Sequence, residues 1–239
     1  MARRRFFVDS VHNGHARITG EDAHHLTRVL RVEAGQKFEI SDNRDVYLAE
    51  VESARKDLVS FAILERMEVL EPVAHTTLLV SLIKFERFEW IVEKATELGV
   101  ERIVPVEAER SEKGLARAAA KRLERWKRIA REASEQSRRA RLPEIEACIG
   151  LPAALATAAD YRYVLEERTA PPILEALPAE RKPQDRVALL VGPEGGWTDR
   201  EREAIAAAGW RAVSLGREIL RAETAAIAAL AILNAAWLV

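Results

Sequence analysis

The chain has 239 residues, of which 48% are hydrophobic and 31% charged, and its formal net charge is −1. This composition is typical of a folded protein of one large or two small domains, and it excludes an intrinsically disordered chain. Because the chain has no overall positive charge, binding to nucleic acid would need a local basic surface. The single cysteine, Cys148, excludes an intrachain disulfide and suits a reducing cytoplasm.

Residues 1–71 are predicted to form a small β-barrel, because short β-like runs alternate with turn residues. The runs are RRFFV (4–8), HARIT (15–19), KFEIS (37–41), VYLAEVES (46–53) and LVSFAILERMEV (58–69). One helix is expected over 21–31. The N-terminal stretch MARRRFFVDS lacks the apolar core of a signal peptide. Pro72 marks the junction between this region and residues 76–239.

Residues 76–239 alternate between strand and helix patterns, which predicts a second, α/β domain with a mostly parallel sheet. Strands are expected at 76–83, 102–107, 161–167, 186–192 and 211–215, and helices at 84–100, 115–139, 198–208 and 222–238. The longest apolar run, 225–239, contains Asn234 and is too short to cross a bilayer. We therefore expect it to form a buried helix, and we expect a soluble, cytoplasmic protein with no membrane partner.

The stretch VALLVGPEGGWTDRE (187–201) joins an apolar strand to a glycine-rich turn and a helix start. Thr198 and Glu201 have the spacing of a capping box, so the helix should begin near residue 199. The turn GPEGG (192–196) matches neither the dinucleotide fingerprint nor the P-loop, and Glu194 would repel a phosphate. A ligand without phosphates and with a positive charge, such as S-adenosylmethionine, fits better. An ordinary strand-to-helix turn is the alternative.

The stretch SLGREILRAETAA (214–226) is predicted to turn at Gly216 and to enter a helix near Thr224. Its loop can offer backbone groups to a purine edge, with Ile219 and Leu220 as apolar walls. Arg221 and Glu223 are the polar residues beside it. A plain connection with solvated charges is the alternative.

Residues 110–141 hold twelve Lys or Arg and four Glu, an excess of eight positive charges in a chain of net charge −1. A charge run is usually a solvated helix face, but segregation this sharp suggests a phosphate backbone as the partner. Together with the N-terminal region, this segment supplies the candidate RNA-binding residues. They are Arg3, Arg4, Arg5, His25, Arg28, Arg31, Arg110, Lys121, Arg125, Arg128, Arg138 and Arg141.

The five histidines form no metal-binding pattern, because His24 and His25 are adjacent and no H-x-x-x-H or C-x-x-C spacing occurs. We therefore expect no metal. The sequence also has no G-x-S-x-G nucleophile motif, and Cys148 is expected in the core.

Several motifs, in this order, resemble the bacterial 16S ribosomal RNA uridine-N3 methyltransferases of the SPOUT (α/β-knot) superfamily. They are RRFFV, HHLTRVLR with AGQ, KFERFEWIVEKATELGV, ERS, RWKRIAREASEQS, GPEGG and LGREILRAETA, and they span nearly the whole chain. The resemblance implies a PUA-like RNA-binding β-barrel followed by a domain whose last segments form a trefoil knot. It also implies a homodimer that binds S-adenosylmethionine in the knot. Its target would be one uridine in the decoding region of 16S rRNA, which we expect to be reached in the assembled 30S subunit.

By this resemblance the cofactor would lie against the loops 190–196 and 215–221. The candidate cofactor-binding residues are Leu190, Val191, Gly192, Gly195, Gly196, Leu215, Gly216, Ile219, Leu220 and Thr224. Three positions depart from the family pattern. Arg138 replaces a glycine, Glu218 stands where an arginine is common, and Trp197 replaces a phenylalanine.

Uridine N3 carries a proton at neutral pH, so its methylation needs proton removal. We hypothesise that Arg221, with Arg139 of the partner subunit, stabilises the uracil anion. Glu194 and Glu223 are the candidate bases, although either could instead hold a loop amide in place.

Two other classes stay open on the sequence. One is a related knot enzyme that methylates ribose 2′-oxygens; such enzymes commonly carry S-L-N where this chain reads SLG (214–216). The other is an RNA-binding assembly factor without catalysis, against which the intact GPEGG and ILRAETA stretches weigh.

Overall fold

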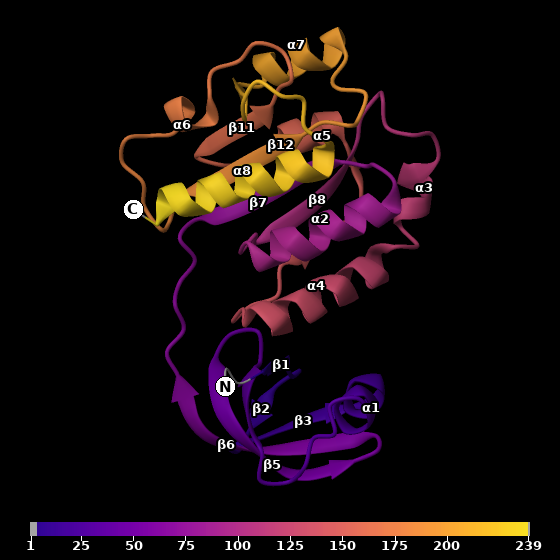
Figure 1. The fold of residues 1–239 in the computed structure, drawn as a ribbon, viewed down its shortest axis with the longest axis vertical. Coiled ribbons are helices and arrows are strands. Elements are labelled where there is room, and N and C mark those ends of the chain that lie inside the picture. Colours follow the sequence, from indigo (N-terminus) through magenta and orange to yellow (C-terminus); the bar gives the residue numbers. More distant parts are fainter. Residues whose placement is uncertain (1–3, 239) are drawn as a thin grey trace. The chain divides into compact units, whose positions relative to one another are not determined.

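A computed structural model describes residues 4–238 (Figure 1), so that the candidate Arg3 lies outside the described residues. Its contacts divide the chain into two compact units. The first comprises the chain up to Leu70 together with Arg131–Leu142, and the second comprises Glu71–Ala130 together with the chain from Pro143 onward. The segment 131–142 therefore groups with the N-terminal residues, whereas the sequence pattern placed it with residues 76–239.

The first unit is built on a six-stranded sheet. In spatial order its strands are β1 (Arg5–Phe7), β4 (Lys37–Ser41), β5 (Val46–Arg55), β6 (Leu58–Met67), β3 (His15–Thr19) and β2 (Val11–His12). All neighbouring strands are antiparallel except β1 and β4, which are parallel. In β3 the alternation of buried Ala16 and Ile18 with exposed neighbours gives the sheet one apolar face. The helix α1 (Gly20–Arg28) buries Ala23 and Leu26 in the same core.

The second unit is built on a parallel sheet. In spatial order its strands are β10 (Ile149–Gly150), β8 (Arg102–Glu107), β7 (His75–Ser81), β12 (Arg186–Val191), β11 (Tyr161–Leu165) and β13 (Arg211–Val213), and β9 (Glu144–Ile145) also pairs with β8. Every pair in this sheet is parallel. Its central strands read as continuous apolar runs because helices cover both faces.

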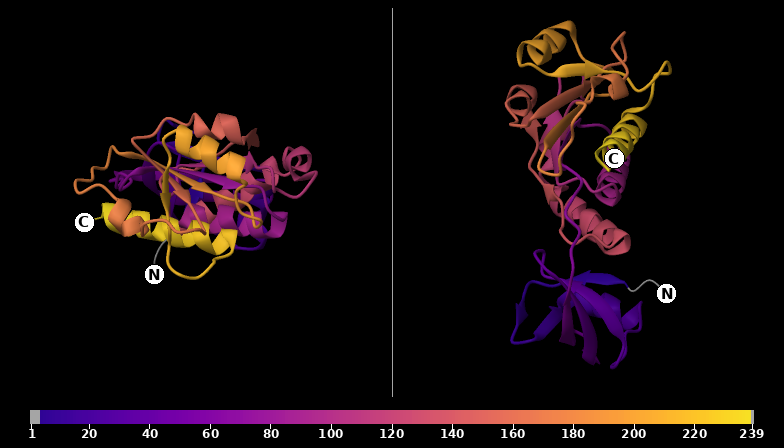
Figure 2. Two further views of the ribbon diagram at one scale, coloured as in Figure 1. Left: turned by 90° about the horizontal axis from the view of Figure 1, so that it is seen from above. Right: turned by 90° about the vertical axis from the view of Figure 1, so that its left-hand side faces the viewer.

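The two faces of this sheet belong to separate hydrophobic clusters. Leu189 points into a cluster with α2 (Phe85–Glu97) and α8 (Ala222–Trp237), whereas Leu190 points into a cluster with α5 (Leu151–Leu155) and α7 (Asp199–Ala207). Figure 2 shows α2 and α8 together on one side of the sheet and α5 on the other. The predicted α/β layering is therefore observed in this unit.

The apolar run near the C-terminus forms α8, which buries Ala226, Ala229, Leu230, Leu233 and Trp237. The prediction of a buried helix is confirmed. Within residues 4–238, no helix is long and apolar enough to cross a membrane.

The prediction of one helix over 115–139 is wrong, because the chain forms α3 (Leu115–Ala119) and α4 (Leu123–Ser137). Between them, backbone N–H groups of Lys121 and Arg122 bond three residues back, which tightens the turn and offsets the two helices. Good helix formers fill the break, so propensity alone gives no sign of it. Four short elements, β2, β9, β10 and α6 (Ile173–Ala176), have no counterpart among the predicted segments, and neither has α5.

Candidate active site

A cavity of about 300 Å³ lies at the carboxyl ends of three neighbouring parallel strands of the second unit. Its walls come from residues 165–167 at the end of β11, from the loop 192–197 after β12, and from the loop 214–221 between β13 and α8. Arg87 of α2 completes the rim. Open α/β sheets bind ligands at this end, where consecutive connections run to opposite sides of a strand.

The loop 192–197 is held in one conformation by several contacts. Gly196 has φ +65° and donates its N–H to the Pro193 carbonyl at 2.9 Å. A side chain at position 196 would also collide with the carboxylate of Glu167. Arg110 donates to the Gly195 carbonyl at 2.7 Å, and Trp197 is buried beneath the loop. Glycine suits the backbone angle at position 196, and any other side chain there would also make the Glu167 carboxylate move.

The helix that follows this loop begins as the sequence predicts. Thr198 accepts a hydrogen bond from Glu201 N–H, and Glu201 accepts one from Thr198 N–H at 2.9 Å. This reciprocal pair is the predicted capping box, which is confirmed. Glu201 Oε1 also accepts the N–H of Glu109 at 2.8 Å, so the cap is tied to the segment after β8.

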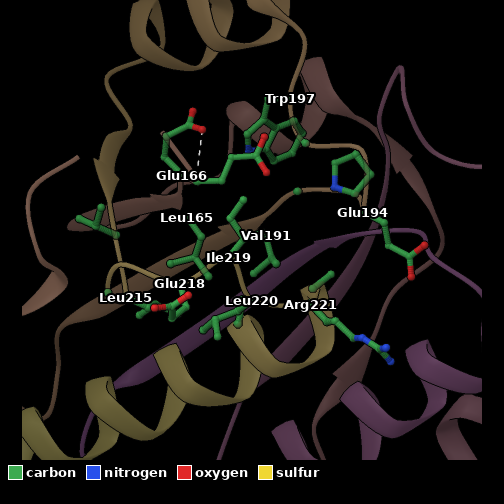
Figure 3. Close-up of a pocket in the computed structure, with 18 of the residues that line it drawn as sticks. Leu165, Glu166, Val191, Glu194, Trp197, Leu215, Glu218, Ile219, Leu220 and Arg221 are labelled. Atoms are coloured by element: carbon green, nitrogen blue, oxygen red, sulfur yellow. Dashed lines mark hydrogen bonds between the residues drawn. The ribbon is translucent and has the colours of Figure 1, made fainter. Parts of the chain in front are cut away.

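A largely buried ion pair supports the wall after β11. Arg202 donates to Glu166 from Nε at 2.8 Å and from Nη2 at 3.2 Å, and it also donates to the Trp197 carbonyl. Burial opposes ionisation of Glu166, but the Arg202 hydrogen bonds and two backbone N–H groups outweigh it and hold the pKa of Glu166 below its usual value. The dashed line in Figure 3 marks a hydrogen bond that Glu166 accepts.

The loop 214–221 makes fewer contacts. Ile219 is 78% exposed, and Gly216 has φ +150°, a region that side chains rarely adopt. Figure 3 shows Leu165, Val191, Ile219 and Leu220 gathered in the middle of the cavity, with Glu194 and Arg221 at one side. The cavity therefore has an apolar centre and a charged rim.

Arg87 links two of the predicted catalytic carboxylates. Its Nη1 donates to Glu194 Oε1, and its Nε lies 3.8 Å from Glu223 Oε1. Glu223 is only 7% exposed, and its Oε2 is buried without a hydrogen-bond partner in the described chain. Arg87 therefore joins α2, the loop 192–197 and the first turn of α8.

The structure brings most of the predicted cofactor-binding residues together. Those that line the cavity are Val191, Gly192, Gly196, Leu215, Gly216, Ile219 and Leu220. Leu190 instead packs on the opposite face of the sheet, and Gly195 lies against Arg110. Thr224 is exposed on the first turn of α8 and is not among the lining residues.

Of the predicted catalytic residues, Glu194 and Arg221 line the cavity and Glu223 does not. Within residues 4–238, Arg221 forms no ion pair, so its guanidinium is available to a ligand. Arg139 belongs to the first unit, where its Nε donates to the Arg141 carbonyl at 3.1 Å.

The predicted RNA-binding residues divide into two groups. Arg5 and Arg138 both donate to the buried carboxylate of Glu39, and Arg125 makes two hydrogen bonds with Glu89 at 2.7 and 2.9 Å. The exposed remainder comprises Arg4, His25, Arg28, Arg31, Arg110, Lys121, Arg128 and Arg141. Arg5 and Arg138 therefore have a structural role in the first unit, whatever else they do.

Sequence reasoning did not single out Arg87, Leu165, Glu166 or Glu167, although all four line the cavity. The strand 161–167 was predicted, but not that it would lie between β12 and β13 in the sheet. Unless the order of the strands in the sheet is known, the end of β11 cannot be placed beside the turn 192–196. In the described part of the chain, no group of three His, Cys, Asp or Glu side chains is arranged to hold a metal ion.

Comparison with known proteins gives the family. Residues 70–234 match the family model described as RNA methyltransferase domain, and residues 18–64 match the RNA methyltransferase PUA domain. The ribosomal RNA small subunit methyltransferase E of Synechocystis sp. is 35% identical over 91% of this chain and 72% of its own length. The chain belongs to the ribosomal RNA small subunit methyltransferase E family. The Bacillus subtilis member is 34% identical over 91% of this chain and 88% of its own.

Solved structures of this family share the fold. The crystal structure of the family member from Neisseria gonorrhoeae, bound to S-adenosyl methionine, has a TM-score of 0.89 and 30% identity, and the match covers 99% of this chain and 98% of that one. The predicted fold class is confirmed, namely a SPOUT α/β domain preceded by a PUA-like domain.

Proposed function

We propose that this chain uses S-adenosylmethionine to methylate N3 of one uridine in the decoding region of 16S rRNA, with the assembled 30S subunit as substrate. The observation that carries the proposal is the cavity formed by the loops 192–197 and 214–221. A relative from Neisseria gonorrhoeae, whose structure matches this chain over nearly its whole length, was solved bound to S-adenosyl methionine.

The lining residues fit this cofactor. The side chains of Leu165, Val191, Ile219 and Leu220 offer an apolar slot for a purine, and the adjacent loops offer backbone groups for its edge. Glu194 disfavours a phosphate at the rim, whereas a sulfonium tolerates it. The cofactor supplies an electrophilic methyl group when bound.

Arg221 is the cationic residue that we assign to the chemical step. Removing the N3 proton leaves charge on the uracil oxygens, and a guanidinium beside them stabilises that charge. Arg221 caps the N-terminus of α8, where its backbone is held by the helix while its side chain lines the cavity. We assign Arg139 of the partner subunit a supporting role, in a homodimer.

Glu194 and Glu223 are the candidate acceptors of the N3 proton. Glu194 Oε1 accepts a hydrogen bond from Arg87, and Glu223 is buried and does not line the cavity. Both carboxylates therefore have a clear role in positioning the loop and the helix. Single-turnover methylation by Glu194→Gln and Glu223→Gln tests the alternative, because a loss of about 100-fold or more in one variant alone would identify a base.

The PUA-like unit supplies RNA binding in this proposal. Its exposed cations Arg28 and Arg31 lie on and just after α1, and contacts to phosphates would make affinity for RNA fall as salt rises. Affinity for RNA measured at several salt concentrations would test this, and the double variant Arg28→Ala/Arg31→Ala should show a smaller slope.

The central claim is tested on rRNA from cells with and without the protein. Mass spectrometry should show one N3-methyluridine missing from 16S rRNA of the deletion strain. Purified protein with S-adenosylmethionine should restore it on isolated 30S subunits and much less on free 16S rRNA. If no methylated uridine disappears, the proposed function is wrong.

A further inference from the structure

Glu166 fixes the turn that follows β11. Its carboxylate accepts the backbone N–H groups of Glu167 at 3.0 Å and Arg168 at 3.2 Å, while its other contacts are the hydrogen bonds from Arg202. The side chains of Glu166 and Arg202 are both largely buried. Glu166 binds Arg202 and two backbone N–H groups of the turn at once, so it serves as a support that holds the next residue at the cavity wall.

Glu167 has the opposite character. Its side chain is 41% exposed and lines the cavity, and its Oε1 lies directly over the α-carbon of Gly196. Within residues 4–238 its carboxylate accepts no hydrogen bond, and the nearest cation is Arg202 Nη2 at 3.7 Å, beyond hydrogen-bond range. Glu167 therefore presents a carboxylate with open acceptor positions to a ligand in the cavity.

A carboxylate with two open acceptor positions suits a ligand that offers two adjacent hydroxyl donors. The ribose of an adenosine carries such a diol, and nucleotide-binding sites of other folds use an acidic residue after a strand for this contact. We propose that Glu167 binds the ribose hydroxyl groups of the cofactor. Gly196 provides the space for that carboxylate, which gives the last glycine of the turn a role in ribose recognition. This inference rests on the proposed function.

The test compares the affinity for a ligand that has both ribose hydroxyl groups with the affinity for ligands that lack one of them. Isothermal titration calorimetry of the full-length chain uses S-adenosylhomocysteine and its 2′-deoxy and 3′-deoxy analogues as probes. Hydrogen bonds to a charged acceptor predict that the unsubstituted chain binds the parent about 10- to 100-fold more tightly than at least one deoxy analogue. In Glu167→Ala the parent should bind more weakly by a similar factor, and the three probes should bind within about 3-fold of one another.

Glu218→Ala is the matched control, because Glu218 is a carboxylate on another wall of the same cavity. This variant should leave the ratio of the dissociation constants of the parent and deoxy probes unchanged. Glu167→Gln keeps the shape of the side chain and one acceptor, so it should retain part of the discrimination. Unchanged discrimination in Glu167→Ala, or none in the unsubstituted chain, would overturn the inference alone. Failure of the unsubstituted chain to bind S-adenosylmethionine at all would overturn the proposed function as well.

Discussion

The two loops that enclose the cavity differ in how firmly the chain holds them. The loop 192–197 has an internal backbone hydrogen bond, an arginine on its Gly195 carbonyl and a buried tryptophan beneath it. It leads into a capped helix. The loop 214–221 bonds its Ser214 N–H to the Pro171 carbonyl at its start and enters α8 at its end. Between these points Ile219 is left exposed.

The loop 192–197 is therefore a cavity wall that is already formed without ligand, whereas the loop 214–221 is a wall that becomes packed only when a ligand binds. An exposed isoleucine that faces a cavity gains burial only when something fills the space beside it. Ordering such a loop on binding costs conformational entropy and so lowers the net affinity, whereas a loop that is already ordered loses no further entropy. Changes in the loop 192–197 should therefore act on stability, and changes in the loop 214–221 should act on the ligand and the reaction.

The largest expected effect belongs to Arg221, at the end of the less restrained loop. Arg221→Ala should lower the single-turnover rate of methylation about 100- to 1,000-fold, the usual loss when one stabilising donor is removed. Cofactor affinity should change less than about 5-fold, because the apolar centre remains. Rates on 30S subunits and calorimetry with S-adenosylmethionine measure the two quantities.

Arg200→Ala, on the exposed side of α7, is the control for loss of one positive charge. It should keep the rate of the unsubstituted chain. A fall in affinity as large as the fall in rate would show that Arg221 binds the cofactor instead of supporting the reaction.

The second prediction compares Gly196 and Gly216, one positive-φ glycine from each of the two cavity loops. Gly196→Ala should lower the free energy of unfolding by about 2 kcal/mol, because the backbone angle is strained and the new side chain meets Glu167. Gly216→Ala is also strained by its backbone angle, but its Cβ has open space, so we expect a smaller loss of about 1 kcal/mol. Urea denaturation of the full chain measures both, and equal losses would remove the distinction between the loops.

Local sequence patterns predicted the better-held loop well. The T-x-x-E spacing of Thr198 and Glu201 placed the helix start at the observed residue, because a capping box is a contact between near neighbours. The strand before it was also predicted, but the side to which each residue points was not. Val191 lines the cavity and Leu190 packs on the opposite face, as the two-residue period of a strand requires.

Contacts between distant segments could not be predicted from such patterns. Arg87 reaches Glu194 across 107 residues, and Arg138 reaches Glu39 across 99. A run of arginines looks the same in sequence whether its members neutralise buried carboxylates or face solvent. The end of β11 joins the cavity only because β11 lies between β12 and β13, an order that chain sequence does not reveal.

The third prediction uses one apolar residue from each wall. Ile219→Ala should weaken binding of S-adenosylmethionine about 5- to 10-fold, the loss expected when the equivalent of between one and two methylene groups becomes buried with the ligand. The free energy of unfolding should stay within about 0.5 kcal/mol, because the side chain is exposed without ligand.

Val191→Ala is the matched substitution in the buried strand end, and it should cost about 1 to 3 kcal/mol of stability. Calorimetry and urea denaturation of both variants complete the comparison. If Ile219→Ala lowered the free energy of unfolding as much as Val191→Ala, the Ile219 side chain would have to be buried in solution even without ligand, contrary to this comparison.

The smallest effect is expected at Thr198, where the firmer loop meets α7. Thr198→Ala removes the side-chain acceptor for Glu201 N–H, and loss of such a cap costs about 1 kcal/mol. The loss should be no larger, because Glu201 keeps its bonds to the N–H groups of Thr198 and Glu109. Thr198→Ser retains a hydroxyl acceptor and should recover most of the stability in urea denaturation. Because these remaining bonds hold the loop in place, cofactor affinity should change less than about 2-fold in Thr198→Ala, and a larger change would mean that the cap itself sets the position of the loop.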